Sequence, residues 1–242
     1  ILHGGNLSKR LHNNPKLSQN IFNNAYKNIA PSEYIQSEFK KQGYHNLLCI
    51  PNSIELKNYP FKKRVLDKLK LLWVRSFSEI YNPLLAIDVL KQLKTNGVDA
   101  SLCMIGPEND GSLKKAKAYA VKLNVAVKFT GKLSKQGWIE LSKDCNIFIN
   151  TTNFDNMPVS VIEAMALGLP VVSTNVGGLS FLIENKKEGL LVEPNDINAF
   201  VNALKKVLSN TEETNTMVLN ARKKVACLDW KVVKKQWFSV LQ

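Results

Sequence analysis

The chain has 242 residues, enough for one large or two modest domains, and 45% of them are hydrophobic, which excludes a disordered protein. No apolar run reaches about 18 residues, so the sequence predicts no membrane-spanning helix. The formal net charge is +13. The lysines are scattered without interleaved aromatic residues, so we expect no nucleic-acid partner. Solvated helix faces account for most of the charge, and attraction to anionic lipid head groups is a second interpretation.

Residues 1–66 form the first section of the chain. It opens on Ile-Leu-His-Gly-Gly, without Met and without a basic-then-apolar start, which is typical of the end of a strand inside a domain. We therefore expect an upstream portion that this sequence lacks. The patterns of the section predict, in order, a helix, a strand, a helix, a strand and a polar loop, at 16–27, 28–30, 33–42, 47–51 and 52–59.

From residue 69 onward, short apolar runs alternate with helical patterns, after a link near residues 61–67. The predicted strands cover residues 69–75, 100–106, 126–131, 145–152, 170–174 and 189–193. The predicted helices cover residues 83–94, 112–123, 135–143, 158–167, 179–184 and 196–208, with Asp196 as the N-cap of the last. This alternation predicts an α/β fold with a doubly wound parallel sheet, followed by a final helix at 230–241.

The segment between residues 150 and 178 carries the clearest functional signal. Asp155 lies just past the predicted strand 145–152, where ligands bind in open α/β sheets. Pro158 suits the first turn of the next helix, and Gly168 suits its C-terminal cap. The unpaired N–H groups and the positive dipole end of this helix predict a phosphate site beside Asp155.

Glu163 lies in the second turn of the same helix, among apolar residues. A carboxylate buried there needs a hydrogen-bonding partner, and ribose hydroxyls would satisfy it. The alternative is that Glu163 lies on a solvent face and that Asp155 is an ordinary loop acid. Gly177 and Gly178 follow the strand 170–174, and they either allow the backbone to approach a ligand closely or form a simple turn.

The four cysteines are widely spaced with no CxxC pair, and two of them fall in predicted buried strands. They are Cys49, Cys103, Cys145 and Cys227. This pattern favours reduced thiols in a cytosolic protein and indicates no zinc site. The three histidines have no metal-ligand spacing either, so we expect no metal centre.

The 150–178 segment resembles the family 4 glycosyltransferases, of the group 1 type, which are retaining enzymes with the GT-B fold. Their Glu-x7-Glu signature, within EGFG…LEAMA-GLPVV-T-VGG, reads here DNMPVSVIEAMALGLPVVSTNVGG, from Asp155 to Gly178. The resemblance extends from about His3 to the C-terminus. It departs at Asp155 in place of Glu, at Asn156-Met157-Pro158 in place of Gly-Phe-Gly, and at Ser180-Phe181 in place of Pro-Glu.

The resemblance implies a division of the chain into three parts. Residues 1–66 would be the end of an N-terminal, acceptor-side Rossmann-like domain. Residues 67–227 would be the complete C-terminal Rossmann-like domain, which binds the nucleotide sugar. Residues 228–242 would form a helix that packs back on the first domain.

The resemblance also implies a donor site. Arg75 would offset the charge of the diphosphate, but the lysine that follows this arginine in the family has no counterpart in residues 78–83. Asp155 would contact the sugar, Glu163 the ribose, and His3 would face the sugar from the N-terminal domain. Further donor-binding positions implied in this way are Gly4, Gly5, Gly131, Asn156, Met157, Val159 and Ser160.

From this resemblance we expect a hexosyltransferase that moves a hexose, with retention, from a nucleotide-diphosphate sugar to a glycan or lipid-linked glycan. It would act in cell-surface polysaccharide synthesis, in the cytoplasm or peripherally at the inner face of the membrane. The chain has no Asp-x-Asp, the metal-binding pair of the other main glycosyltransferase fold, so we expect donor binding without a metal or other cofactor. Two alternatives stay open, a nucleotide-sugar 2-epimerase of the same fold and a non-catalytic sugar-nucleotide-binding protein.

Overall fold

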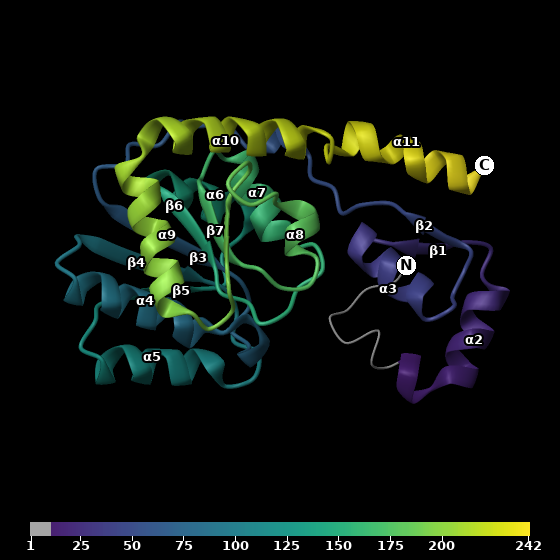
Figure 1. Cartoon of the computed structure of the whole chain (residues 1–242), viewed down its shortest axis with the longest axis horizontal. Coiled ribbons are helices and arrows are strands. Elements are labelled where there is room, and N and C mark those ends of the chain that lie inside the picture. The colour runs from purple at the N-terminus through teal and green to yellow at the C-terminus, as the bar shows by residue number, and fades with distance from the viewer. Residues whose placement is uncertain (1–10) are drawn as a thin grey trace.

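A six-stranded parallel sheet forms the larger part of the molecule in the computed structural model, which describes residues 11–242 (Figure 1). Its strands lie in the order β5-β4-β3-β6-β7-β8, so the chain builds one half outward from β3 and then the other half. The strands are β3 (Leu69–Val74), β4 (Ala100–Ile105), β5 (Lys128–Gly131), β6 (Ile147–Asn150), β7 (Val171–Thr174) and β8 (Leu190–Val192). Every strand predicted in this section is present, with ends shifted by at most two residues.

Helices cover both faces of this sheet, which confirms the doubly wound α/β fold. One apolar core joins the sheet to α4 (Pro83–Thr95), α5 (Ser112–Lys122) and α9 (Ile197–Ser209). A second core joins the other face to α6 (Lys135–Leu141), α7 (Val159–Ala166), α8 (Leu179–Leu182) and α10 (Thr211–Ala226). The neighbouring residues Leu72 and Trp73 of β3 are fully buried in different cores, as expected of a strand that is covered on both sides.

Two helical segments differ from the sequence prediction. Helix α10 was not predicted, because its first half reads Thr-Glu-Glu-Thr-Asn-Thr and its apolar stripe begins only at Met217. The predicted helix 135–143 ends earlier, as α6, and continues into the 3-10 turn η3 (Ser142–Asp144). The predicted N-cap of α9 is confirmed, since the Asp196 side chain accepts a hydrogen bond from the N–H of Ala199 at 2.8 Å.

A smaller part of the molecule contains α2 (Pro15–Asn24), β1 (Asn28–Ala30), α3 (Glu33–Lys41) and β2 (Leu47–Cys49). The two strands pair in parallel. The last helix, α11 (Trp230–Leu241), packs on them through Val233, which is buried with Ile29 and Ile50. Among the described residues, no helix is both long and apolar enough to cross a membrane.

The chain passes twice between the two parts, and the two passages lie side by side. Ile54 in the first passage pairs with Asp229 in the second. The N–H of Ile54 donates to the carbonyl of Leu228 at 3.1 Å. The carbonyl of Ile54 in turn accepts from the N–H of Trp230 at 2.8 Å. The Asp229 carboxylate accepts from the N–H of Leu56, at the start of the 3-10 turn η1 (Leu56–Asn58), and caps α11 through the N–H of Lys231.

Arg64 fastens the end of the first passage to the large sheet. Its guanidinium is buried and donates to the carbonyls of Ser142, Cys145 and Leu167, at 2.7, 3.1 and 2.9 Å. Burial lowers the pKa of Arg64 from its usual value, because the charged form is removed from water. These hydrogen bonds therefore compensate a costly burial of charge.

Replacing Arg64 with Met should lower the free energy of unfolding by about 3 kcal/mol, because three buried carbonyl oxygens lose a charged donor. Urea-induced unfolding, followed by circular dichroism, measures this change. Lys63→Met, at the exposed neighbour, is the matched control and should stay within about 0.5 kcal/mol of the unsubstituted chain. Equal losses in both variants would contradict the role of Arg64.

Candidate donor-binding site

The site lies where the strand order of the large sheet reverses. From β3 the chain moves to β4 and β5 on one side and then to β6, β7 and β8 on the other, so β3 and β6 flank the point of reversal. Arg75 directly follows β3, and Asp155 lies in the loop after β6. In open α/β sheets, ligands bind in the crevice at this point, outside the carboxyl ends of the strands.

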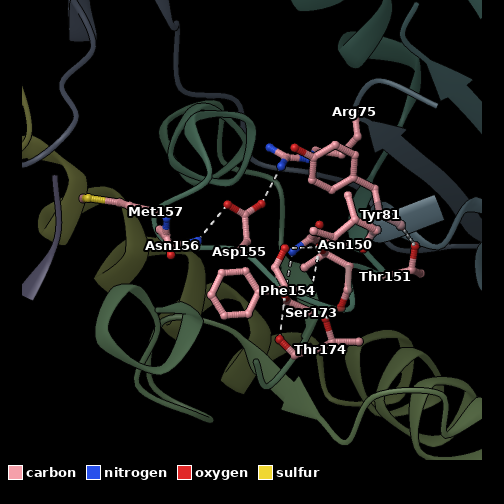
Figure 2. Close-up of polar contacts among 12 residues, drawn as sticks. Arg75, Tyr81, Asn150, Thr151, Phe154, Asp155, Asn156, Met157, Ser173 and Thr174 are labelled. Atoms are coloured by element: carbon pink, nitrogen blue, oxygen red, sulfur yellow. Dashed lines mark hydrogen bonds and ion pairs between the residues drawn. The ribbon is translucent and has the colours of Figure 1, made fainter. Parts of the chain in front are cut away.

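Arg75 and Asp155 form an ion pair across this crevice (Figure 2). Nη2 of Arg75 lies 2.5 Å from Oδ2 of Asp155, and the two side chains are only 15% and 14% exposed. The guanidinium carbon also lies 3.8 Å from the centre of the Tyr81 ring. Nε of Arg75 is buried and has no hydrogen-bond partner among the described residues.

Burial raises the pKa of the Asp155 carboxyl above its usual value. The Arg75 guanidinium and the N–H of Asn156 act in the opposite direction, because both stabilise the charged form. The net effect is a raised pKa, so the folded chain keeps Asp155 ionised at a cost in free energy. A ligand that donates hydrogen bonds to Asp155 would reduce that cost.

A layer of uncharged polar side chains supports the loop that carries Asp155 (Figure 2). The hydroxyl of Thr151 accepts from the indole N–H of Trp73 at 3.0 Å, and the hydroxyl of Thr174 donates to the carbonyl of Thr152 at 2.6 Å. Asn150 donates to the hydroxyl of Ser173 at 3.0 Å. These contacts tie the ends of β3, β6 and β7 together beneath the ion pair.

Gly177 and Gly178 press directly against the backbone of the acid loop. The N–H of Gly178 donates to the carbonyl of Asp155 at 2.8 Å. A Cβ atom at Gly177 would lie 2.1 Å from the Asp155 oxygen, and one at Gly178 would lie 1.8 Å from the Asn156 oxygen. The two glycines thus permit a close approach of two loops, and they are more than a simple turn.

Helix α7 points its N-terminus into the same region. The helix begins at Val159, one residue after the predicted start, so Pro158 is its N-cap rather than part of its first turn, and Gly168 follows its end with φ +76°. The first N–H groups of a helix have no partner within it. The Ser160 hydroxyl, in the first turn, is buried and has no hydrogen-bond partner among the described residues. Asn52, from the first passage, donates to the carbonyl of Met157 at 2.9 Å and so steadies the approach to the helix.

Glu163 does not lie on a solvent face, so that alternative is wrong. Its side chain is 3% exposed, and Oε1 accepts hydrogen bonds from the Tyr59 hydroxyl at 2.6 Å and from the Lys135 ammonium. Burial, together with the hydrogen bond to Glu163, raises the pKa of Tyr59, so its hydroxyl remains a donor. The carboxylate has therefore one uncharged partner and one charged partner.

A cavity of about 400 Å³ lies between the two parts of the molecule, and it reaches the acid loop at Met157 and Gly178 without being lined by Arg75, Asp155 or Glu163. Met157 and Phe181 line it from the larger part, and Ser32 and Pro51 line it from the smaller part. The ring of Tyr34, on α3, lies 5.9 Å from that of Phe181 and joins the two parts at this point. The volume falls within the range of small-molecule sites, about 300–1,000 Å³.

The family model for glycosyl transferases group 1 matches residues 57–224, which is more than half of the chain. The chain belongs to this family. The match covers the large sheet together with the site at its reversal point. It also confirms the family-level part of the resemblance seen in the sequence.

Relatives and solved structures agree with this assignment. The chain is 28% identical over 193 residues to the UDP-Gal:alpha-D-GlcNAc-diphosphoundecaprenol alpha-1,3-galactosyltransferase of Escherichia coli, covering 73% of this chain and 48% of that protein. It is 28% identical over 182 residues to the putative colanic acid biosynthesis glycosyltransferase WcaL of Escherichia coli, covering 72% and 45%. The chain thus spans about half the length of the curated relatives it matches.

Solved structures show that the fold is of the GT-B type. Anabaena Alr3699/HepE in complex with UDP and glucose superimposes with a TM-score of 0.83 at 21% identity, over 97% of this chain and 67% of that one. Sucrose-phosphate synthase from Thermosynechococcus elongatus gives the same TM-score at 22% identity, over 93% and 60%.

The remaining predicted positions of this group 1 chain can now be located. Gly131 ends β5 with φ +71°, and its carbonyl accepts from the N–H of Gly106 at 3.0 Å. Val159 begins α7. His3, Gly4 and Gly5 lie outside the described residues. Among residues 11–242 no cluster of His, Cys, Asp and Glu could hold a metal ion.

Three residues at the site were not predicted. Lys135 and Tyr59 hold Glu163, and Asn52 holds the carbonyl of Met157. Asn52 begins the predicted polar loop 52–59, but the sequence did not predict its contact with Met157. Lys135 and Tyr59 had no signal in the sequence, because only the fold brings them to Glu163.

Asp155→Asn tests the burial cost of this carboxyl through its pH dependence. A native pKa above the usual 3.8 means that the carboxyl's contribution to stability is fully present below that value and is lost as the pH rises through the raised pKa. The unsubstituted chain should therefore gain stability relative to Asp155→Asn when the pH falls from about 7 to about 4. Urea unfolding of both proteins at both pH values measures this difference. Asp67→Asn, at an exposed aspartate, is the matched control, and an equal pH dependence in the two variants would refute the prediction.

Proposed function

We propose that this chain binds a nucleotide-diphosphate sugar and takes part in a retaining transfer of its hexose to a glycan or lipid-linked glycan, in cell-surface polysaccharide synthesis, as a member of family 4. The observation that carries the proposal is the pair of buried carboxylates, Asp155 and Glu163, on either side of the first turn of α7, each held by a basic residue. The names of the two Escherichia coli relatives support the substrate class.

Each group of the site has a proposed role in donor binding. Glu163 accepts hydrogen bonds from the ribose hydroxyls, as acidic residues do in other nucleotide-binding α/β folds. Asp155 accepts hydrogen bonds from hydroxyls of the sugar. The N–H groups of Met157, Val159 and Ser160 and the Ser160 hydroxyl face the diphosphate, and Arg75 donates to it from the other side. Gly131 offers backbone groups to the nucleobase.

In the transfer step, the bond between the anomeric carbon and the diphosphate oxygen breaks, and negative charge develops on the departing diphosphate. Arg75 and the N-terminus of α7 offset this charge from fixed positions, which lowers the barrier without a rearrangement during the reaction. We propose that these groups suffice without a metal ion or another cofactor. His3 would complete the site over the sugar.

Two other functions remain as outcomes of the tests. A nucleotide-sugar 2-epimerase of the same fold would convert the donor in the absence of any acceptor, and product analysis without acceptor distinguishes it from a transferase. A non-catalytic sugar-nucleotide-binding protein would bind the donor and release it unchanged. The absence of a lysine in residues 78–83 favours this last function.

Glu163→Gln should weaken the binding of UDP, GDP or ADP, whichever binds best, by about tenfold or more, because an amide replaces a charged acceptor of the ribose hydroxyls. Calorimetric titration without added metal measures the dissociation constant. Glu140→Gln, on the exposed side of α6, is the matched control and should bind like the unsubstituted chain. Equal binding by Glu163→Gln and the unsubstituted chain would refute the ribose assignment.

We also propose that α11 contacts anionic membrane lipids. Trp230, Phe238 and Leu241 are 41%, 54% and 76% exposed on this helix. Lys231 and Lys235 are exposed beside them and form no ion pair with a described residue. A helix that exposes aromatic and basic residues together is suited to the lipid–water interface, where apolar contacts and attraction to anionic head groups add.

The double variant Lys231→Glu/Lys235→Glu should bind vesicles of phosphatidylglycerol and phosphatidylcholine at least about tenfold more weakly than the unsubstituted chain, because each lysine near the surface contributes about 1 kcal/mol. Co-sedimentation measures the bound fraction. Lys114→Glu/Lys115→Glu, on α5, makes the same change in net charge and is the control. Equal losses in both double variants would show a general charge effect and refute a contact at α11.

A further inference from the structure

Lys135 is the one partner of Glu163 that can move without disturbing the core. Its side chain is 57% exposed, whereas the side chain of Glu163 is 3% exposed. Tyr59, the other partner, is buried, and its carbonyl is held by Arg222 at 2.9 Å. The carboxylate is therefore fixed from the inside by Tyr59 and covered on its outer side by a flexible lysine.

A ribose that binds Glu163 would share one carboxylate with Lys135, which is bonded to its Oε1. Oε1 already accepts two hydrogen bonds, from Tyr59 and Lys135, so it has little capacity for a third. The buried tyrosine cannot make room. The ammonium can, because a lysine has a long flexible stem and three donors that it can redirect.

The charges of the site explain where the ammonium would go. Asp155 and Glu163 are negative, Arg75 and Lys135 are positive, and the four charges sum to zero before any ligand binds. Arg75 is already paired with Asp155. The segment from β3 to α4 adds the acid Glu79 and no base. A nucleoside diphosphate thus brings negative charge to four groups whose own charges already balance.

We propose that Lys135 is a donor-binding residue that exchanges partners. When ribose hydroxyls bind Glu163, the Lys135 ammonium turns from the carboxylate to the phosphates of the same nucleotide and supplies a second cation in addition to Arg75. This inference rests on the proposed function, because it requires that a nucleoside diphosphate binds at Glu163.

The test compares Lys135→Met with Lys132→Met, at an exposed lysine in the loop just before α6 that forms no ion pair with a described acid. UDP, GDP and ADP are titrated first by calorimetry, and the best of them is then compared with its own nucleoside and monophosphate. Lys135→Met should weaken diphosphate binding by about tenfold or more, since a charge-assisted hydrogen bond is lost, and nucleoside binding by less than about twofold. Lys132→Met should change each by less than about twofold. The salt dependence of diphosphate binding should also become less steep in Lys135→Met.

Other outcomes overturn the inference in distinguishable ways. Tighter diphosphate binding in Lys135→Met would show that the lysine only covers Glu163. An equal loss for nucleoside and diphosphate would show that it only orients the carboxylate. Absence of binding to the unsubstituted chain would refute the proposed function, and with it the inference. Urea midpoints of both variants, measured alongside, identify any loss that comes from unfolding.

Discussion

The ion pair between Arg75 and Asp155 is the interaction around which the rest of the site is arranged. It joins the ends of β3 and β6, the two strands at which the sheet reverses direction. Because burial opposes the charge on Asp155, the loop must be held by other means, and the hydroxyl layer beneath it and the close approach of Gly178 above it do this.

Uncharged and charged polar groups have different tasks in this arrangement. Asn150, Thr151 and Thr174 are buried, and their hydrogen bonds to neighbouring strands and loops offset the cost of removing these polar groups from water. The charged groups lie one layer further out, at the crevice. Removing an uncharged group would shift the loop, whereas removing a charged one would change what the loop can bind.

The sequence predicted the sheet well, because apolar runs of four to eight residues identify buried strands wherever they occur. Arg75 ends one such run and Asp155 follows another, so both lie at the carboxyl edge of the sheet, but the sequence did not predict their ion pair. It did not predict α10, whose polar first half hides its apolar stripe. Nor did it predict the partners of Glu163, because Lys135 and Tyr59 lie 28 and 104 positions away from it and no local pattern records such contacts.

The two chain passages between the parts of the molecule are joined by backbone hydrogen bonds between Ile54 and residues 228–230. Two unconnected passages would let the smaller part of the molecule twist and slide relative to the larger part. Two passages that are hydrogen-bonded to each other allow chiefly a bend about a single axis. Tyr59 lies in the first passage, just beyond these hydrogen bonds, and its hydroxyl ends on Glu163. The angle between the two parts of the molecule is thereby mechanically connected to the carboxylate of Glu163.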